Sequence, residues 1–408
     1  MYCEDVPLST IAGEVGTPFY LYSHATLRQH YRAFDGAFEN TRHLTCFSMK
    51  SNSNLAILRL FALEGGGVDI VSGGELFRAL KAGVAPERIV YSGVGKGAED
   101  LAYALRSDIL LLNAESSEEI LLLNSVAAGL GKKARIGIRV NPDIDPQTHP
   151  YISTGLRENK FGIDVRRALE EYEKAAHLPH LDICGVSCHI GSQLTLLSPF
   201  VEALRKMKDL IGTLEGRGIR IRYLDLGGGL GITYNKEEPP HPEEYARAIR
   251  EELDMKDLTL VLEPGRVIVG NAGVLVTKVL YTKSTADKNF IIVDAAMNDL
   301  VRPSFYGSFH GIQPVKMSGR EKITADIVGP ICESGDFLAK DRKVQIPEAG
   351  DLLAVMSSGA YGFAMSSNYN SRPRVAEVMV KEDGYRVVRA RETYDDLIRG
   401  EVIPDYLL

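Results

Sequence analysis

The chain alternates between short apolar runs and helix-length amphipathic segments, and this alternation limits the folds that it can adopt. Strand-like runs lie at His43–Met49, Gly67–Val71, Arg88–Tyr91, Asp108–Asn113, Ala134–Val140, Leu181–His189, Arg222–Leu226 and Leu258–Glu263. Segments with helical periodicity lie at Leu55–Glu64, Gly74–Ala82, Ala98–Ser107, Ser117–Leu130, Val165–Ala176, Phe200–Glu215 and Pro242–Glu252. This pattern is typical of an α/β fold, the (β/α)8 barrel. The alternative, an open doubly wound sheet, usually has a glycine-rich turn after its first strand, whereas this chain has Lys50 there.

Beyond Arg266 the pattern changes, because apolar runs follow one another without long helices between them. These runs lie at Val274–Tyr281, Phe290–Val293, Ile323–Val328, Leu352–Met356, Val375–Val380 and Tyr385–Ala390. They predict a second, mostly antiparallel β domain of Greek-key or β-sandwich type, with a short helix near Tyr394–Arg399. We expect residues 18–270 to form the barrel, including a strand at Pro18–Tyr22 and a helix at Ala25–Phe38. Residues 1–17 and 271–408 would form the β domain, since chain ends often lie together.

Composition excludes several classes of protein. The 408 residues are 45% hydrophobic and carry a net charge of -7, which indicates a globular chain without a basic surface for nucleic acid. Apolar runs stay shorter than a membrane span, and the first residues are acidic rather than typical of a secretory signal. The cysteines are scattered and odd in number, which favours a reducing cytoplasm over a disulfide framework. Strand alternation separates His189 from Cys184 and Cys188, so we expect no metal site there.

A lysine, Lys50, closes the first strand of the expected barrel. Burying an unpaired ammonium is costly, so this position needs an explanation. A single lysine at a strand end is most often a surface side chain whose ammonium reaches water. The alternative is an amine held near its neutral form to make a Schiff base. The residues at the other strand ends bear on this choice.

Polar or glycine-rich groups follow most of the expected strands, at the end of a barrel where active sites lie. These groups are Lys50, Asp69, Arg139–Asn141, His189, Asp225–Gly231 and Glu263–Arg266. The glycine run that includes Gly228 and Gly229 follows the seventh strand, and Gly265 and Arg266 follow the eighth. Barrels typically bind phosphate with these two loops. Tight turns also use glycine, but the adjacent cation favours a phosphate site.

A phosphate site, a lysine at the barrel rim and a strand-end carboxylate together suggest pyridoxal 5′-phosphate as cofactor. Lys50 would form the internal aldimine. Glu263 would pair with the ring nitrogen and keep it protonated. His189 is placed to lie against the ring, although an interior histidine with ordinary hydrogen bonds would show the same pattern. Asp69 would orient Lys50 or His189, or balance charge inside the barrel.

Nearly the whole chain, from about Gly16 to the C-terminal helix, resembles the pyridoxal-phosphate decarboxylases of the alanine-racemase-like fold, and most closely the diaminopimelate decarboxylase family. The motifs that carry the resemblance are Met49–Asn52, Val68–Leu76, Ile152–Ile163, Cys188–Gln193, Gly227–Gly229, Glu263–Arg266, Arg302–Tyr306, Gly329–Asp336 and Gly359–Tyr361. The lysine motif reads Ser-Met-Lys-Ser-Asn, where the family more often has Ala-Leu-Lys-Ala-Asn. This change alters the packing beside the lysine and leaves its implied role intact.

The resemblance implies roles that the residues alone do not assign. Contacts to the cofactor and its phosphate would come from Ser192, Gly228, Gly229, Glu263, Pro264, Gly265, Arg266 and Tyr361. Arg266, Arg302 and Tyr306 would bind a distal substrate carboxylate, with Tyr361 also contacting substrate. Glu333 would bind the distal ammonium, and Cys332 would donate a proton. A free cysteine is usually a small buried hydrophobe, but Cys332 is flanked by acidic residues in a glycine-bounded loop.

The reaction that the resemblance implies is the decarboxylation of meso-2,6-diaminopimelate to L-lysine and carbon dioxide, the last step of lysine biosynthesis. It would pass through an external aldimine and a quinonoid, and Cys332 would return the proton. The implied assembly is a homodimer with shared active sites, because Lys50 lies in the barrel and Cys332 in the β domain.

The alternatives are a related decarboxylase acting on ornithine, arginine, carboxynorspermidine or a carrier-bound glutamyl group, a racemase, and an inactive regulatory homologue. The second-domain motifs do not suit a racemase, and an inactive homologue should have lost Lys50 or Cys332. Arg302 and the Cys332–Glu333 pair favour a substrate with a second carboxylate and a second ammonium.

Overall fold

The computed structural model describes residues 1–145, 159–253 and 257–408. These residues form two compact units, one of residues 28–268 and one of residues 1–27 with 269–408. Most of the predicted motif Ile152–Ile163 therefore lies outside the described residues.

The first unit is the predicted (β/α)8 barrel. Its strands are β4 (His43–Ser48), β5 (Gly67–Ile70), β6 (Ile89–Tyr91), β7 (Leu111–Ala114), β8 (Ala134–Asn141), β10 (Leu181–Ser187), β11 (Tyr223–Asp225) and β12 (Thr259–Leu262). They pair in parallel in chain order, and β12 pairs with β4 to close the sheet. The short strand β9 (Ile163–Asp164) pairs with the end of β8. This arrangement confirms the predicted barrel.

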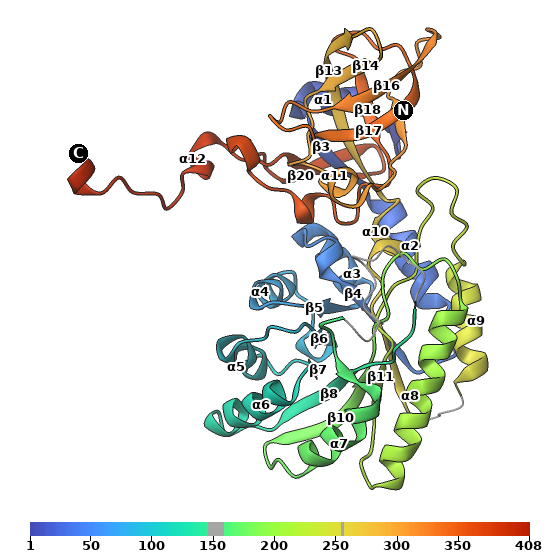
Figure 1. The fold of residues 1–408 in the computed structure, drawn as a ribbon, viewed down its shortest axis with the longest axis vertical. Coiled ribbons are helices and arrows are strands. Elements are labelled where there is room, and N and C mark those ends of the chain that lie inside the picture. The colour runs from blue at the N-terminus through green and yellow to red at the C-terminus, as the bar shows by residue number, and fades with distance from the viewer. Residues whose placement is uncertain (146–158, 254–256) are drawn as a thin grey trace. The chain divides into compact units, whose positions relative to one another are not determined.

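Helices lie outside these strands (Figure 1). They are α2 (His24–Gly36), α3 (Leu55–Leu63), α4 (Gly73–Lys81), α5 (Ala98–Arg106), α6 (Ser117–Gly129), α7 (Val165–Ala176), α8 (Ser198–Gly216), α9 (Pro242–Glu252) and α10 (Arg266–Val269). Several begin directly after a strand at a side-chain cap. Ser72 accepts a hydrogen bond from the Glu75 amide and Ser116 from the Glu119 amide, each at 3.2 Å, which satisfies a first-turn N–H.

The interior of the barrel is packed with apolar side chains, including Cys46, Val90, Leu111, Cys184 and Val261. All four residues of β5 are buried, as expected for a parallel strand that is covered on both faces. The polar residues at the strand ends therefore sit on a rigid, close-packed support.

The second unit contains the predicted, mostly antiparallel sheet. Its elements are β1 (Tyr2–Cys3), β2 (Val6–Pro7), α1 (Leu8–Val15), β3 (Phe19–Ser23), β13 (Gly273–Ser284), β14 (Asn289–Val293), α11 (Arg302–Tyr306), β15 (Ile312–Pro314), β16 (Lys322–Val328), β17 (Phe337–Gln345), β18 (Leu352–Val355), β19 (Ala376–Lys381), β20 (Gly384–Arg389) and α12 (Tyr394–Leu397). The sheet runs β17-β16-β14-β13-β3-β19-β20, and β18 pairs with both β13 and β15. Its core includes Phe19, Leu21, Val276, Ala354 and Val378.

The elements β1, β2, α1, α11 and β15 were not predicted, and two further features of this unit differ from the sequence prediction. Strand β3 pairs with β13 and β19, so Phe19–Ser23 belongs to the β domain rather than to the barrel, and the first boundary moves to residues 27 and 28. Strand β17 was not predicted, because its centre is the charged run Lys340–Lys343. Charged side chains of this kind are common on strands at the edge of a sheet, which is where β17 lies.

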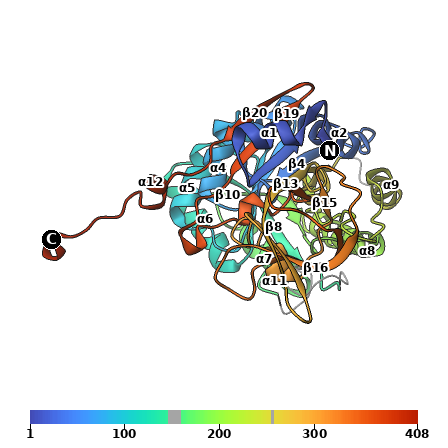
Figure 2. The ribbon, with the colours of Figure 1, turned by 90° about the horizontal axis from the view of Figure 1, so that it is seen from above.

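The segment from α12 to Leu408 extends away from the sheet of its own unit in both views (Figures 1 and 2). Its apolar side chains are exposed, and Val402 and Leu408 keep 83% and 90% of their accessible surface. Within the described part of the chain, no helix combines the length and the apolar character needed to cross a membrane.

Candidate active site

Lys50 lies just beyond the end of β4 rather than within the strand. The strand ends at Ser48, and residues Met49–Ser51 form a single 3-10 turn. The hydroxyl of Ser51 donates to the Ser48 carbonyl at 2.7 Å and so closes this turn. The turn directs the Lys50 ammonium to Asp69, with 2.8 Å between Nζ and Oδ2. The Lys50 side chain keeps 33% of its surface accessible, whereas Asp69 is fully buried.

The sequence predicted that Asp69 would orient Lys50, orient His189 or balance charge inside the barrel. In the structure Asp69 contacts Lys50. The Ser48 hydroxyl also donates to Asp69 Oδ2, at 2.8 Å, and it lies 3.1 Å from the Glu263 carbonyl. Ser48 thus joins the ends of β4, β5 and β12 at one point. The sequence alone does not single out Ser48, because it reaches Asp69 and the Glu263 carbonyl only when the three strands are paired.

Glu263 follows β12 and lies inside the barrel beside a second carboxyl group, that of Asp225 at the end of β11. The negative charges of these two neighbouring carboxyl groups repel each other. Burial, together with the negative charges of Asp225 and Asp69, raises the pKa of Glu263 well above its usual range. Burial also raises the pKa of Asp225 to about 6. A cationic partner beside Glu263 would offset the repulsion between these carboxylates.

Asp225 is fixed by its own donors. The sequence placed it at a strand end of the expected site but assigned it no role. The Asn113 amide donates to it at 2.7 Å, and the Gly227 backbone N–H donates at 2.9 Å. Asn113 is itself fully buried in β7, across the barrel from β11. In the sequence, the signal for this pair was a polar residue, asparagine or aspartate, near the end of each of two apolar strands.

His189 is held as a neutral ring. Its Nδ1 accepts a hydrogen bond from the Gly228 backbone N–H at 3.2 Å, so Nδ1 carries no hydrogen. Burial and the nearby positive charges of Lys50 and Arg139 lower its pKa well below the usual range. The side chain therefore presents an uncharged aromatic face at the end of β10.

The glycine run after β11 approaches the neighbouring strand ends very closely. A Cβ at Gly228 would lie 2.0 Å from the Glu263 carbonyl, and one at Gly229 would lie 2.6 Å from the Gly191 carbonyl. Backbone amides of Gly227, Gly228 and Gly231 donate to Asp225, His189 and Leu194 respectively. Because these three amides already have acceptors, Gly229 and Leu230 are the residues of the run whose backbone amides we expect to bind a phosphate.

Arg266 begins α10 directly after the Glu263–Gly265 turn and is only 5% exposed. Its guanidinium donates to the Ser192 hydroxyl at 3.0 Å and to the Tyr234 hydroxyl at 2.6 Å. The structure thus brings together Ser192 and Arg266, two predicted phosphate contacts from distant parts of the sequence. A buried guanidinium flanked by hydroxyl groups is a suitable setting for an anion.

The remaining predicted site residues lie in the β domain. Arg302 begins α11 and is 5% exposed; one of its Nη atoms lies 2.9 Å from His310 Nε2, and the other donates to Ser308 at 3.2 Å. Tyr306 ends the same helix and is partly buried. Tyr361 has a left-handed backbone with φ of 55°, an uncommon conformation for a bulky residue that often marks functional positions.

Cys332 and Glu333 occupy an exposed loop whose base is anchored by Asp336. The two oxygens of Asp336 accept from the Met297 and Ile331 amides, each at 2.7 Å. The Cys332 amide donates to the Asn370 side chain at 2.9 Å. The loop is therefore braced at both ends while the thiol itself stays accessible.

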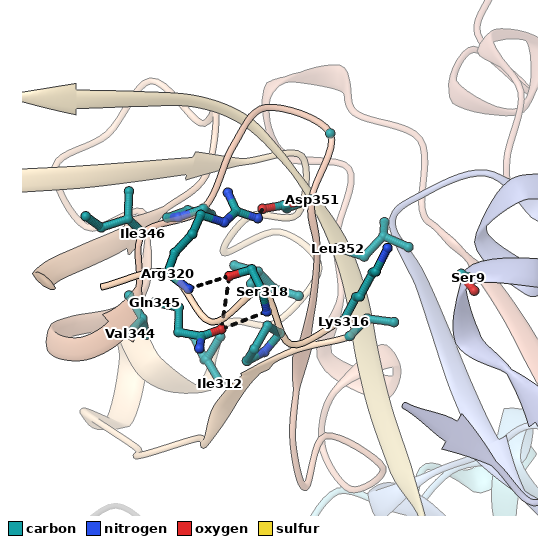
Figure 3. A pocket seen from close by; sticks show the side chains of 15 residues that line it. Ser9, Ile312, Lys316, Ser318, Arg320, Val344, Gln345, Ile346, Asp351 and Leu352 are labelled. Carbon is teal, nitrogen blue, oxygen red and sulfur yellow. Dashed lines mark hydrogen bonds and ion pairs between the residues drawn. The ribbon is translucent and has the colours of Figure 1, made fainter. Parts of the chain in front are cut away.

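The β domain also contains a cavity of about 200 Å³ (Figure 3). Its walls come from β15, β17, β18 and the segment around Arg320, and Ser318 and Gln345 are hydrogen-bonded at its edge. None of the predicted site residues lines it.

Comparisons with known proteins decide the family. The model for the pyridoxal-dependent decarboxylase, pyridoxal binding domain, matches residues 24–270. The diaminopimelate decarboxylase of Pseudomonas aeruginosa is 55% identical, over 98% of this chain and 96% of its own length. A crystal structure of diaminopimelate decarboxylase from Helicobacter pylori, complexed with L-lysine, aligns with a TM-score of 0.93 at 46% identity, covering 96% of this chain and 98% of that one. The chain belongs to the diaminopimelate decarboxylase family.

Two further comparisons bear on this assignment. The diaminopimelate decarboxylase of Aquifex aeolicus is 50% identical over 98% of this chain and 94% of its own length. A lysine/ornithine decarboxylase from Vibrio vulnificus, complexed with cadaverine, shares only 22% identity at a TM-score of 0.82, and so shows the fold alone. Membership in the diaminopimelate decarboxylases confirms the resemblance drawn from the motifs and identifies the chain as an enzyme of a pyridoxal-dependent family.

Proposed function

We propose that the chain removes one carboxyl group from meso-2,6-diaminopimelate and releases L-lysine and carbon dioxide, as the last step of lysine biosynthesis. The observation that carries this proposal is the set of groups at one end of the barrel: the Lys50 amine held 2.8 Å from buried Asp69, the neutral His189 ring and the buried Glu263 carboxyl group. Pyridoxal 5′-phosphate would bind among these groups.

The residues present fit this cofactor. Lys50 would supply the primary amine that bonds to its carbonyl carbon, and Asp69 would orient that amine. Burial and neighbouring carboxylates raise the pKa of Glu263, so a cationic ring nitrogen would stabilise its negative charge. Glu263 would in turn keep the ring nitrogen protonated. His189 offers an uncharged surface for the ring. Gly229, Gly265, Arg266 and Ser192 would hold the phosphate, and close backbone approach at Gly228 shapes the floor.

When bound, pyridoxal phosphate supplies a conjugated ring that stabilises the electron pair left on the substrate carbon after carbon dioxide departs. The chain provides orientation and charge for this step. Arg266, Arg302 and Tyr306 would hold the distal carboxylate. Tyr361 would also contact the substrate, and Glu333 would hold the distal ammonium. Cys332 would return a proton from Sγ to the carbon that lost the carboxyl group.

The two groups of site residues belong to different compact units of the chain, and we assign the complete site to a homodimer with shared active sites. The exposed apolar segment from Tyr394 to Leu408 supports association with another chain. The free cysteines support a cytoplasmic location, where thiols stay reduced.

A substrate panel tests the proposed function. We expect the purified holoenzyme to release carbon dioxide and L-lysine from meso-diaminopimelate, and to act much more slowly on ornithine, arginine or carboxynorspermidine. These substrates lack the second carboxylate that the buried Arg302 guanidinium is expected to bind, and a site built for a polar group rejects analogues without it. Preference for any of the other substrates would favour the related decarboxylases instead.

A further inference from the structure

His310 links the Arg302 guanidinium to the sheet of the β domain. The histidine is fully buried, and it directly precedes the short Gly311 connection to β15. The Met356 amide donates to the Gly311 carbonyl at 2.8 Å, which extends the antiparallel pairing of β15 and β18 by one step. The backbone beside His310 is therefore fixed by the sheet.

The two hydrogen bonds of the His310 ring determine its tautomer. Nδ1 lies 2.9 Å from the Met356 carbonyl oxygen, which can only accept, so Nδ1 carries the hydrogen. Nε2 lies 2.9 Å from an Nη atom of Arg302, which can only donate, so Nε2 offers its lone pair. A ring that makes both bonds is neutral.

This contact orients a guanidinium through a neutral acceptor. At Arg302 the contacts with His310 and Ser308 are to neutral acceptors, and both fix the plane of the guanidinium. Planar orientation matters because a guanidinium binds a carboxylate best through two parallel N–H groups.

We propose that His310 is a positioning residue that sets the affinity of this enzyme for the carboxylate on the unreacted carbon of its substrate. The proposal rests on the proposed function, in which Arg302 binds that carboxylate. His310 would do so by fixing the plane of the Arg302 guanidinium.

The test compares two ligands that differ by one carboxylate. L-lysine retains the carboxylate of the unreacted carbon, and cadaverine is the same diamine without it. Their dissociation constants for the cofactor-loaded enzyme are measured from the spectral change on binding. In His310→Asn the amide can still donate to Met356 but offers no acceptor to Arg302, and we expect the preference for lysine over cadaverine to fall at least about tenfold. In His310→Gln the side-chain oxygen reaches the Nε2 position, and we expect most of the preference to return.

Arg302→Met separates failure of this inference from failure of the proposed function. Loss of the preference in Arg302→Met and His310→Asn, with its return in His310→Gln and unchanged cadaverine affinity, supports the positioning role. Loss in Arg302→Met alone overturns the role of His310 and leaves the proposed function intact. An unchanged preference in Arg302→Met overturns both. Equal weakening of lysine and cadaverine in His310→Asn shows a purely structural role and also overturns the inference.

Discussion

A Glu263→Gln enzyme is expected to keep its cofactor and to turn over about a hundredfold to a thousandfold more slowly than the wild type. The substitution preserves the size of the side chain but removes the negative charge that Glu263 would place beside the ring nitrogen. Without that charge the ring holds its proton less firmly and accepts the electron pair from carbon dioxide loss less readily. Measuring kcat together with the absorption spectrum of the bound cofactor separates this effect from loss of the cofactor.

A matched control is Glu171→Gln. Glu171 is a buried glutamate on α7, 3% exposed and paired with Lys174 at 3.2 Å, and it has no predicted role in the site. We expect this variant to turn over at the wild-type rate once folded. A Glu263→Gln enzyme with wild-type kcat would show that the proposed pairing with the ring nitrogen is wrong.

Mixing two inactive variants is expected to restore activity. Lys50→Ala removes the barrel amine, and Cys332→Ala removes the proposed proton donor, so each homodimer should be nearly inactive. When the two chains are unfolded and refolded together, random pairing makes about half of the dimers mixed. Each mixed dimer has one intact site in two, so activity should approach roughly a quarter of the wild-type value.

The same experiment can contradict the shared site. If mixed dimers demonstrably form but the refolded sample stays inactive, each site is built within one chain. Cys3→Ala controls for the loss of a thiol elsewhere in the β domain, since Cys3 is a free cysteine without a predicted role, and it should leave activity unchanged.

The sequence predicted the barrel well because its strand and helix periods are strong and regular. The helices Val165–Ala176 and Pro242–Glu252 begin and end where the periodicity placed them. The charged strand β17 and the boundary at β3 were missed for a shared reason: neither is decided by local composition. Strand β17 is stabilised by pairing at a sheet edge, and β3 joins strands that lie far away in the sequence.

The site residues also divide into those that local sequence can identify and those that depend on distant partners. Residues at strand ends, such as Lys50 and Glu263, could be selected because a parallel barrel brings all such ends to one rim. Residues whose role depends on a partner could not. Ser48 and His310 have no distinctive local pattern, and their contacts arise only when separate strands are paired. Asp225 was placed at a strand end, but its contact with Asn113 also depends on that pairing.

Borohydride reduction of the purified enzyme followed by peptide mapping tests the proposed role of Lys50 most directly. Reduction fixes a Schiff base as a stable secondary amine, so the modified lysine identifies the residue that holds the cofactor. We predict a single label, on Lys50, and none in Lys50→Ala. A label on any other lysine, or a protein that carries no reducible cofactor, would contradict the central role given to Lys50.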